Sequence, residues 1–130
     1  MTSQTVQMSR KPPEVIHCDL NAHLNAAWIG NEPYFTGFRF DVGGKHWVMA
    51  TMPGEPLLQL GWWTRNDSLA AGFDGMIIAG YSQEHMGYFA TEREYDIGGY
   101  ESQLTFWGVH TANKVRDAVK AVLQALSPSG

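Results

Sequence analysis

The stretch Ala50-Thr51-Met52-Pro53-Gly54-Glu55-Pro56 ends an apolar run, turns sharply and places one carboxylate just before a proline. The run before it, Trp47 to Ala50, is short and apolar, as a buried strand is. Pro53-Gly54 is a turn dipeptide, and Pro56 suits the first position of a helix. The pattern predicts that Glu55 lies between a strand end and a helix start, where open α/β sheets bind ligands. The alternative is that Glu55 only interacts favourably with the N-terminus of that helix.

The residues after this turn predict a βαβ unit. A helix is expected from Pro56 to about Arg65, with a broad apolar face that indicates heavy burial, and Asn66-Asp67-Ser68 should interrupt it. The most apolar run, Met76 to Gly80, is expected to form a central strand. Its carboxyl end opens into a polar loop, Tyr81 to Tyr88. If the two strands are parallel neighbours, Glu55 and this loop emerge at the same edge of the sheet.

The residues before the turn predict a β-hairpin. Phe38, Phe40 and Val42 alternate with polar residues, which is the period of a half-buried strand. Gly43-Gly44 then favours a two-residue hairpin turn, and Lys45 to Thr51 forms the returning strand.

The remaining segments give weaker signals. Residues 1–12 are expected to be a mobile tail, 13–127 a single α/β domain and 128–130 a C-terminal tail. Within that domain we expect a weak strand over 14–20 and helical turns at 22–27 and 92–97. A further strand is expected over 103–107, and a C-terminal amphipathic helix over 111–126.

The composition of the 130 residues bounds the class of protein. One domain with a real core is expected at this length. A net charge of −4 and a pI near 5.6, without a Lys/Arg cluster, argue against a nucleic-acid binder. No apolar run approaches membrane-spanning length, and the first residues lack a signal-peptide pattern, so the localisation is unknown.

Several polar side chains are candidates for chemistry. Four possible ligands gather near the N-terminus, namely His17, Cys18, Asp19 and His23, but their spacing matches no zinc motif, and we interpret them as strand and loop residues. Glu84-His85 lies in the polar loop that should face Glu55. His46 and His110 are isolated and are interpreted as structural. No nucleophile elbow or phosphate-binding glycine loop is present, so the residues alone predict a polar site around Glu55 and the 81–88 loop.

Several short segments share their order and spacing with the motifs of one family. They are Met52-Pro53-Gly54-Glu55-Pro56, Ile78-Ala79-Gly80-Tyr81-Ser82, Gly87-Tyr88-Phe89-Ala90-Thr91, the pair Glu94-Tyr95 and Tyr100-Glu101, and Gly108-Val109-His110-Thr111. In these segments the chain resembles the neutral/alkaline (non-lysosomal) ceramidases. The resemblance covers roughly residues 36 to 126 and only the C-terminal part of the family's catalytic domain.

The resemblance implies a zinc-dependent hydrolase of sphingolipid metabolism that cleaves the N-acyl amide bond of ceramide. By the same resemblance, Glu55 and Tyr88 match two metal ligands, and Tyr100 matches a catalytic tyrosine that contacts the reacting substrate. The family's two zinc histidines precede this part of the domain, and the first 35 residues here do not resemble their motifs. Val109 also replaces the family's proline.

The resemblance therefore implies a half-site for zinc, in a chain that is inactive alone. A partner chain could supply the missing catalytic half, and the surface that meets it should then be apolar. The chain could instead be a non-catalytic remnant. A third alternative is a metal-independent small-molecule binder that uses exposed aromatic rings, although core positions are the favoured interpretation of these rings: Trp62, Trp63, Trp107, Tyr81 and Tyr88.

Overall fold

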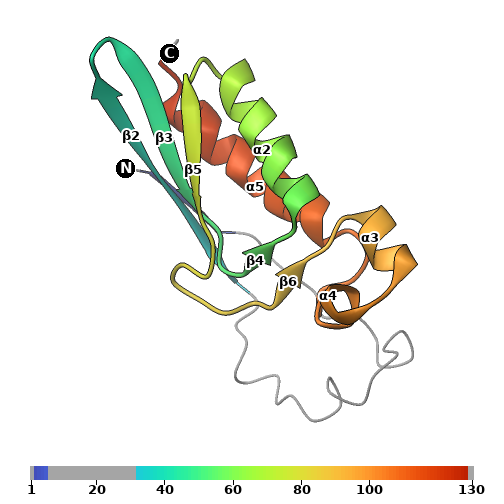
Figure 1. Ribbon diagram of the computed structural model, residues 1–130. Helices are drawn as coiled ribbons and strands as arrows, with labels where there is room; N and C mark the ends of the chain where they lie inside the picture. The colour runs from blue at the N-terminus through green and yellow to red at the C-terminus, as the bar shows by residue number, and fades with distance from the viewer. Residues whose placement is uncertain (1, 6–31, 129–130) are drawn as a thin grey trace.

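The computed structural model describes residues 2–5 and 32–128, and these form a mixed α/β fold (Figure 1). Its main sheet has the strand order β1-β2-β3-β5. The strands are β1 (Thr2–Thr5), β2 (Tyr34–Val42), β3 (Lys45–Thr51) and β5 (Gly75–Ala79). The first three are antiparallel neighbours, whereas β3 and β5 run parallel and are joined through helix α2 (Leu58–Ala70). The predicted mixed sheet with a βαβ unit is confirmed.

The β2–β3 hairpin forms as predicted, but its buried face is the opposite one. Gly43 and Gly44 both have positive φ, 59° and 76°, as the tight hairpin turn requires. A Cβ at Gly37 would lie 2.3 Å from Val122 of the C-terminal helix, so Gly37 faces the helices. Side chains alternate along a strand, so Phe38, Phe40 and Val42 point away from the helices, and the predicted burial of their face is wrong.

Two helices cover the other face of the sheet. These are α2 and α5 (Thr111–Leu126), which lie side by side against β2, β3 and β5 (Figure 1). The core between the layers is fully buried and includes Phe35, Val48, Leu60, Val115, Val119, Val122 and Leu123. The predicted C-terminal helix and its apolar face are confirmed.

Helix α2 does not stop at Asn66-Asp67-Ser68, where an interruption was predicted, but continues to Ala70. The reason is that its polar side chains find partners. Asp67 accepts two hydrogen bonds from Arg116 of α5, at 2.7 and 2.8 Å, and the Ser68 hydroxyl donates to the Arg65 carbonyl at 2.8 Å. Satisfied polar groups no longer compete with the helix backbone.

The predicted heavy burial of the apolar residues of α2 is also wrong. Leu60 is the one large apolar residue of α2 that is fully buried, and the other fully buried residues, Thr64 and Ser68, are polar. Three large apolar side chains instead lie more than half exposed to solvent, namely Leu58, Trp62 and Leu69.

A second, two-stranded sheet lies below the first in Figure 1 and contains β4 (Glu55–Pro56) and β6 (Tyr88–Phe89). Two short helices follow it, α3 (Glu92–Ile97) and α4 (Tyr100–Gln103). The helical turn predicted at 92–97 is confirmed, with a capping box between Thr91 and Glu94. The strand predicted at 103–107 is wrong, because its first residue completes α4 and the Thr105 hydroxyl donates to the Glu101 carbonyl.

Of the N-terminal segments for which predictions were made, the structure describes only residues 2–5. Residues 2–5, expected within a mobile tail, form β1 and add an antiparallel strand to the edge of β2. Their polar sequence carries no apolar period, so this pairing leaves no signal in the pattern. The strand and turn predicted at 14–20 and 22–27 lie outside the described residues. No helix among the described residues is long and apolar enough to cross a membrane.

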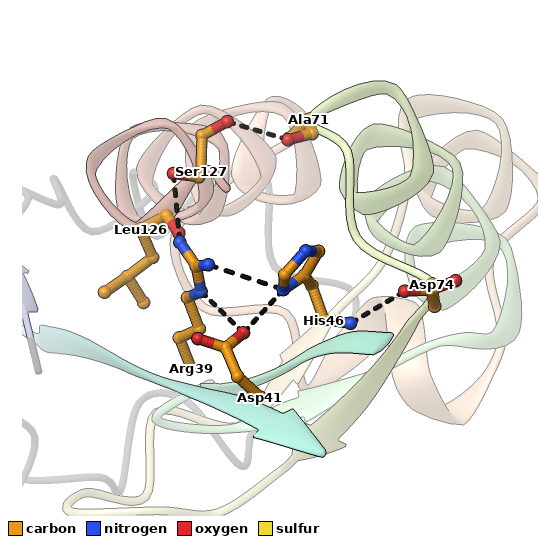
Figure 2. A network of polar contacts seen from close by, with 7 residues as sticks. All are labelled: Arg39, Asp41, His46, Ala71, Asp74, Leu126 and Ser127. Carbon is orange, nitrogen blue, oxygen red and sulfur yellow. Dashed lines mark hydrogen bonds and ion pairs between the residues drawn. The ribbon is translucent and has the colours of Figure 1, made fainter. Parts of the chain in front are cut away.

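A polar network joins the hairpin to the end of α5 (Figure 2). Arg39 donates to the carbonyl oxygens of Leu126 and Ser127 and pairs with Asp41 at 2.9 Å. The Asp41 carboxylate also contacts His46 Nδ1 at 2.6 Å. An arginine at a helix C-terminus binds carbonyls that have no partner inside the helix and interacts favourably with the helix dipole. This network holds the helix end on the sheet, which gives His46 a structural role.

Candidate functional site

The site is built on two chain reversals that bind each other. After β3, the turn at Met52–Glu55 exchanges backbone hydrogen bonds with the segment after β5. The Tyr81 amide donates to the Gly54 carbonyl at 3.0 Å, and the Glu55 amide donates to the Gly87 carbonyl at 2.9 Å. Glu55 and the 81–88 loop thus lie at the same edge of the sheet, as the parallel strands predicted.

Glycine is required where these two segments approach most closely. A Cβ at Gly54 would lie 2.5 Å from the Gly87 carbonyl oxygen and 2.7 Å from the Phe89 ring. Gly87 itself has a φ of 76°, and a Cβ there would lie 2.5 Å from the Leu104 carbonyl oxygen. The Pro-Gly-Glu segment therefore brings Glu55 alongside β6 only because its glycine has no side chain.

Glu55 does not cap a helix, so the alternative of a helix-start acid is wrong. It lies in β4, while α2 begins at Leu58 and has no acidic residue in its first turn. In the parallel pairing of β4 with β6, Glu55 is the register partner of Tyr88. These two predicted site residues therefore lie side by side, and burial and then the Glu55 carboxylate raise the pKa of Tyr88.

Two further tyrosines complete a cluster around the Glu55 carboxylate. The Tyr81 hydroxyl donates a short hydrogen bond to Glu55 Oε2. Tyr100, the first residue of α4, places its ring edge-on to Tyr88 with 5.6 Å between centroids. Tyr100 is 64% exposed, so the cluster opens to solvent on the Tyr100 side. We call Glu55, Tyr81, Tyr88 and Tyr100 the tyrosine cluster.

The electrostatics of the cluster raise the pKa of two of its phenols, Tyr81 and Tyr88. Burial raises the pKa of Tyr81 well above its usual range, and the hydrogen bond to the Glu55 carboxylate raises it further. The pKa of Tyr88 is raised by the same two causes, and Tyr100 adds to them. The carboxylate is thus held by neutral phenol donors. This arrangement fixes the position of its oxygens and leaves them able to accept a cation or a donor.

Tyr81 is the residue whose contact with Glu55 the sequence did not predict. It belongs to the 81–88 loop of the predicted polar site and to the set of aromatic rings, but no individual role in the site is predicted for it. It lies in the matched segment Ile78–Ser82, and that segment is the signal that could have identified it. Its backbone has a positive φ of 52°, which is uncommon for a residue other than glycine and is typical of functional sites.

The histidines have different surroundings. The centroids of the His85 and Tyr81 rings are 4.8 Å apart, so His85 borders the tyrosine cluster but is not hydrogen-bonded to Glu55. His110, the residue before α5, pairs with Glu92 at the start of α3, at 2.7 Å. Beside His85, Glu84 has one carboxylate oxygen that is shielded from solvent and has no hydrogen-bond partner.

Among the described residues, no group of three or more His, Cys, Asp and Glu side chains could hold a metal ion. His17, Cys18, Asp19 and His23 lie outside those residues. Trp107 does not support the alternative of a small-molecule binder that uses exposed aromatic rings, because it is buried and donates to the Met86 carbonyl at 3.0 Å. Trp63 is partly buried under the Arg116 guanidinium, so of the three tryptophans considered only Trp62 is mainly exposed.

The fold and the tyrosine cluster define a mixed α/β domain whose polar site joins a carboxylate to phenols. No family model matches the sequence. No curated protein matches it either. Among solved structures, the chain is similar to the neutral ceramidase from Pseudomonas aeruginosa, with a TM-score of 0.70 and 20% identity over 92% of this chain and 20% of that one. A ceramidase complexed with C2 is similar at a TM-score of 0.64 and 21% identity, over 76% of this chain and 15% of that one.

The chain therefore has the fold of one part of a ceramidase. The resemblance to the neutral ceramidases that the sequence motifs indicated is confirmed at the level of the fold. The chain spans about a fifth of the length of the Pseudomonas enzyme.

Proposed function

We propose that this domain forms one side of a ceramidase-type, metal-dependent amide-hydrolase site. The observation that carries the proposal is the register pairing of Glu55 with Tyr88, with Tyr100 beside them, in a fold similar to part of a neutral ceramidase. Three residues with which the sequence matches the family's site support the proposal: Glu55 lies beside Tyr88, and Tyr88 beside Tyr100, although the three come from separate elements.

In this proposal Glu55 and Tyr88 are ligands of zinc. A carboxylate oxygen and a phenol oxygen are suitable donors, but a zinc site has three or four protein ligands. Among the described residues, Glu55 belongs to no group of three or more His, Cys, Asp and Glu side chains, so they fit one half of a site. The nitrogen ligands would have to come from outside the described residues. A bound zinc would act as a Lewis acid and lower the pKa of a bound water.

The tyrosine cluster positions groups for this chemistry. Tyr81 holds one Glu55 oxygen through its hydrogen bond, which orients the carboxylate. Tyr100 is the most exposed of the three tyrosines, and its hydroxyl could donate a hydrogen bond to the oxygen of an amide carbonyl as negative charge develops there. The substrate class is a ceramide-like lipid with an N-acyl amide bond.

Metal titration of the purified chain tests the ligand assignment. The isolated chain should bind zinc weakly, because it provides half a site, and should hydrolyse ceramide no faster than background. Binding should produce the ultraviolet difference spectrum of ionised tyrosine, because a metal ligand must lose its proton. Glu55→Gln and Tyr88→Phe should each abolish the signal. Tyr34→Phe, an exposed tyrosine on β2, should leave it unchanged.

Two results would contradict the proposal. Zinc binding that survives both substitutions would remove Glu55 and Tyr88 from the ligand set. Near-stoichiometric zinc together with ceramide hydrolysis by the isolated chain would show that the site is complete and that the half-site is wrong.

A further inference from the structure

One face of the main sheet is apolar and is covered by no helix of the described residues. Helices α2 and α5 lie on the same side of the sheet, and no labelled helix lies on the other (Figure 1). Cross-strand pairs place Phe38 beside Met49, Phe40 beside Trp47, and Met49 beside Ile77. We define the open face as the large apolar residues that point away from the helices: Tyr34, Phe38, Phe40, Val42, Trp47, Met49 and Ile77.

The size and charge of the open face are those of a binding surface. Five of its side chains are between 39% and 67% exposed. With about 150–250 Å² for each aromatic side chain, these fractions amount to roughly 500 Å² of apolar surface. That equals the largest patch of a typical monomer. On β2, β3 and β5 the only charged residue that shares this face is Lys45, at the hairpin end.

The open face continues to an unpaired sheet edge. Among the described strands, β5 pairs only with β3, so its outer edge is free. A groove of about 370 Å³ lies between that edge and α2 and is lined by Leu58, Trp62 and Ile78. The sequence of β5 is apolar on both faces, as in strands covered on both sides. Yet Ile77 is 53% exposed.

We propose that the open face and the β5 edge form the surface on which the remaining part of a ceramidase-type fold packs. This inference rests on the proposed function, since it takes that fold as the source of the partner. The chain accounts for only 20% of the ceramidase to which it is similar, so most of such a fold lies outside it. Domains are layered, and a sheet buries its apolar face against a second layer. A face whose one charged residue, Lys45, lies at the hairpin end, together with an edge that is free among the described strands, suits an apolar layer that also adds a strand.

The test is co-expression of this chain with the Pseudomonas aeruginosa neutral ceramidase from which the matching fifth has been deleted. The same deleted enzyme with its own excised fifth is the positive control. We expect a one-to-one complex by size-exclusion chromatography with light scattering, in buffer with a metal chelator. The triple variant Phe40→Thr, Val42→Thr and Ile77→Thr should weaken it at least about tenfold, because buried anchors dominate interfaces. Ile97→Thr is the matched control, since Ile97 is 73% exposed on α3 and lies off the face.

The chain alone provides a second measurement that does not require the deleted enzyme to fold. We expect it to self-associate without a fixed stoichiometry as its concentration rises, and the triple variant should do so less. A monodisperse monomer at high concentration would contradict the proposal. A defined dimer that the triple variant abolishes would overturn it by assigning the face to a second copy.

Binding and chemistry can fail separately. A complex that forms without amide-hydrolase activity, after zinc is restored, would count against the proposed function and leave the interface standing. If the positive control assembles and this chain does not, or if the triple variant binds as well as the original chain, the interface is wrong.

Discussion

At the scale of single residues, the geometry of the site depends on Gly54 and on the hydroxyl of Tyr81. Gly54 lets the turn after β3 touch the backbone at Gly87. Tyr81 then donates to the carboxylate that this turn presents. Neither residue is a predicted ligand, but both fix where the Glu55 oxygens lie.

Gly54→Ala should destabilise the domain by about 1–3 kcal/mol, since the new methyl group would meet the Gly87 carbonyl and the Phe89 ring in a packed region. Urea unfolding measures the change. The matched control is Gly61→Ala in α2, where a Cβ makes only an ordinary contact with Ile78 at 3.6 Å. That control should stabilise the domain by about 0.5–1 kcal/mol, because alanine is the better helix former. Equal effects of the two changes would contradict the steric argument.

Tyr81 should ionise later than an ordinary tyrosine. Its pKa is raised by burial and by the Glu55 carboxylate, so its phenol stays protonated above the usual pKa of about 10. A raised pKa means that the stability it provides is present below that value and is lost as pH rises further. Ultraviolet titration of phenolate should therefore lose a late-ionising group in Tyr81→Phe. Loss of an early group in Tyr81→Phe would contradict the assignment.

At the scale of elements, polar pairs decide where α2 continues and how α5 ends. Asp67 and Arg116 join the two helices through two hydrogen bonds, and the Arg116 guanidinium lies over the Trp63 ring at 5.3 Å. At the other end, Arg39 binds the last carbonyls of α5 (Figure 2). Both contacts link residues that are distant in the sequence, and neither leaves a local pattern.

Asp67→Ala should lower the free energy of unfolding by about 1–2 kcal/mol, because it removes two charge-assisted hydrogen bonds from a carboxylate that is mostly shielded from solvent. The neighbouring Asn66→Ala, at an exposed position, should change it by less than about 0.5 kcal/mol. Urea unfolding of both variants separates the inter-helix contact from a general effect of helix propensity. A larger loss in Asn66→Ala would show that the ion pair does not sustain the helix.

Asp41 should make stability depend on acid pH. Hydrogen bonds from Arg39, and then from His46, hold the pKa of Asp41 below its usual range. A carboxyl whose pKa is lower in the folded state stabilises the fold above its unfolded pKa of about 3.9, and this stability is lost as pH falls below that value. As the pH falls from 5 to below about 3.9, the free energy of unfolding of Asp41→Asn should therefore decrease less than that of the original chain. Parallel pH profiles of the two proteins would contradict this.

At the scale of the whole molecule, the domain has one covered and one uncovered side, and this explains which predictions failed. The hairpin, the parallel crossover and α5 follow from local periods and turn residues, so the sequence predicts them. The burial expected for Phe40, Val42 and Trp62 is wrong, and β5, expected at the centre of the sheet, lies at its edge among the described strands. These three side chains, and Ile77 of β5, are apolar yet exposed, because no described residue covers them. An apolar period predicts burial but does not name the surface that provides it.

The candidate site, like the fold, could be predicted from the sequence only in part. The parallel strands bring Glu55 and the 81–88 loop to one edge, which follows from topology. The pairing of Glu55 with Tyr88 requires the register of a two-residue sheet, which no periodicity encodes. The hydrogen bond of Tyr81 depends on a left-handed backbone at a non-glycine residue, which propensity disfavours.

The exposed apolar surface should make the solubility of the chain depend on net charge. The chain carries −4 at pH 7 and its pI is near 5.6, so repulsion between molecules vanishes close to that pH. Light scattering at fixed concentration should be strongest near pH 5.6 and fall towards pH 8. Phe40→Thr with Val42→Thr and Ile77→Thr should lower it throughout. Scattering that is independent of pH would show that charge does not control association.

The two-residue pairing of β4 with β6 also has a consequence for the order in which the chain folds. The β2–β3 hairpin and α5 contain local contacts, which form within microseconds, whereas parallel pairing must first close a long loop. The pairing of Glu55 with Tyr88 closes the segment that contains α2 and β5, so we expect it to form after the local contacts of the hairpin and the helices. The tyrosine cluster should thus be among the last features to assemble. A tyrosine signal from it would report arrival at the native state, not collapse.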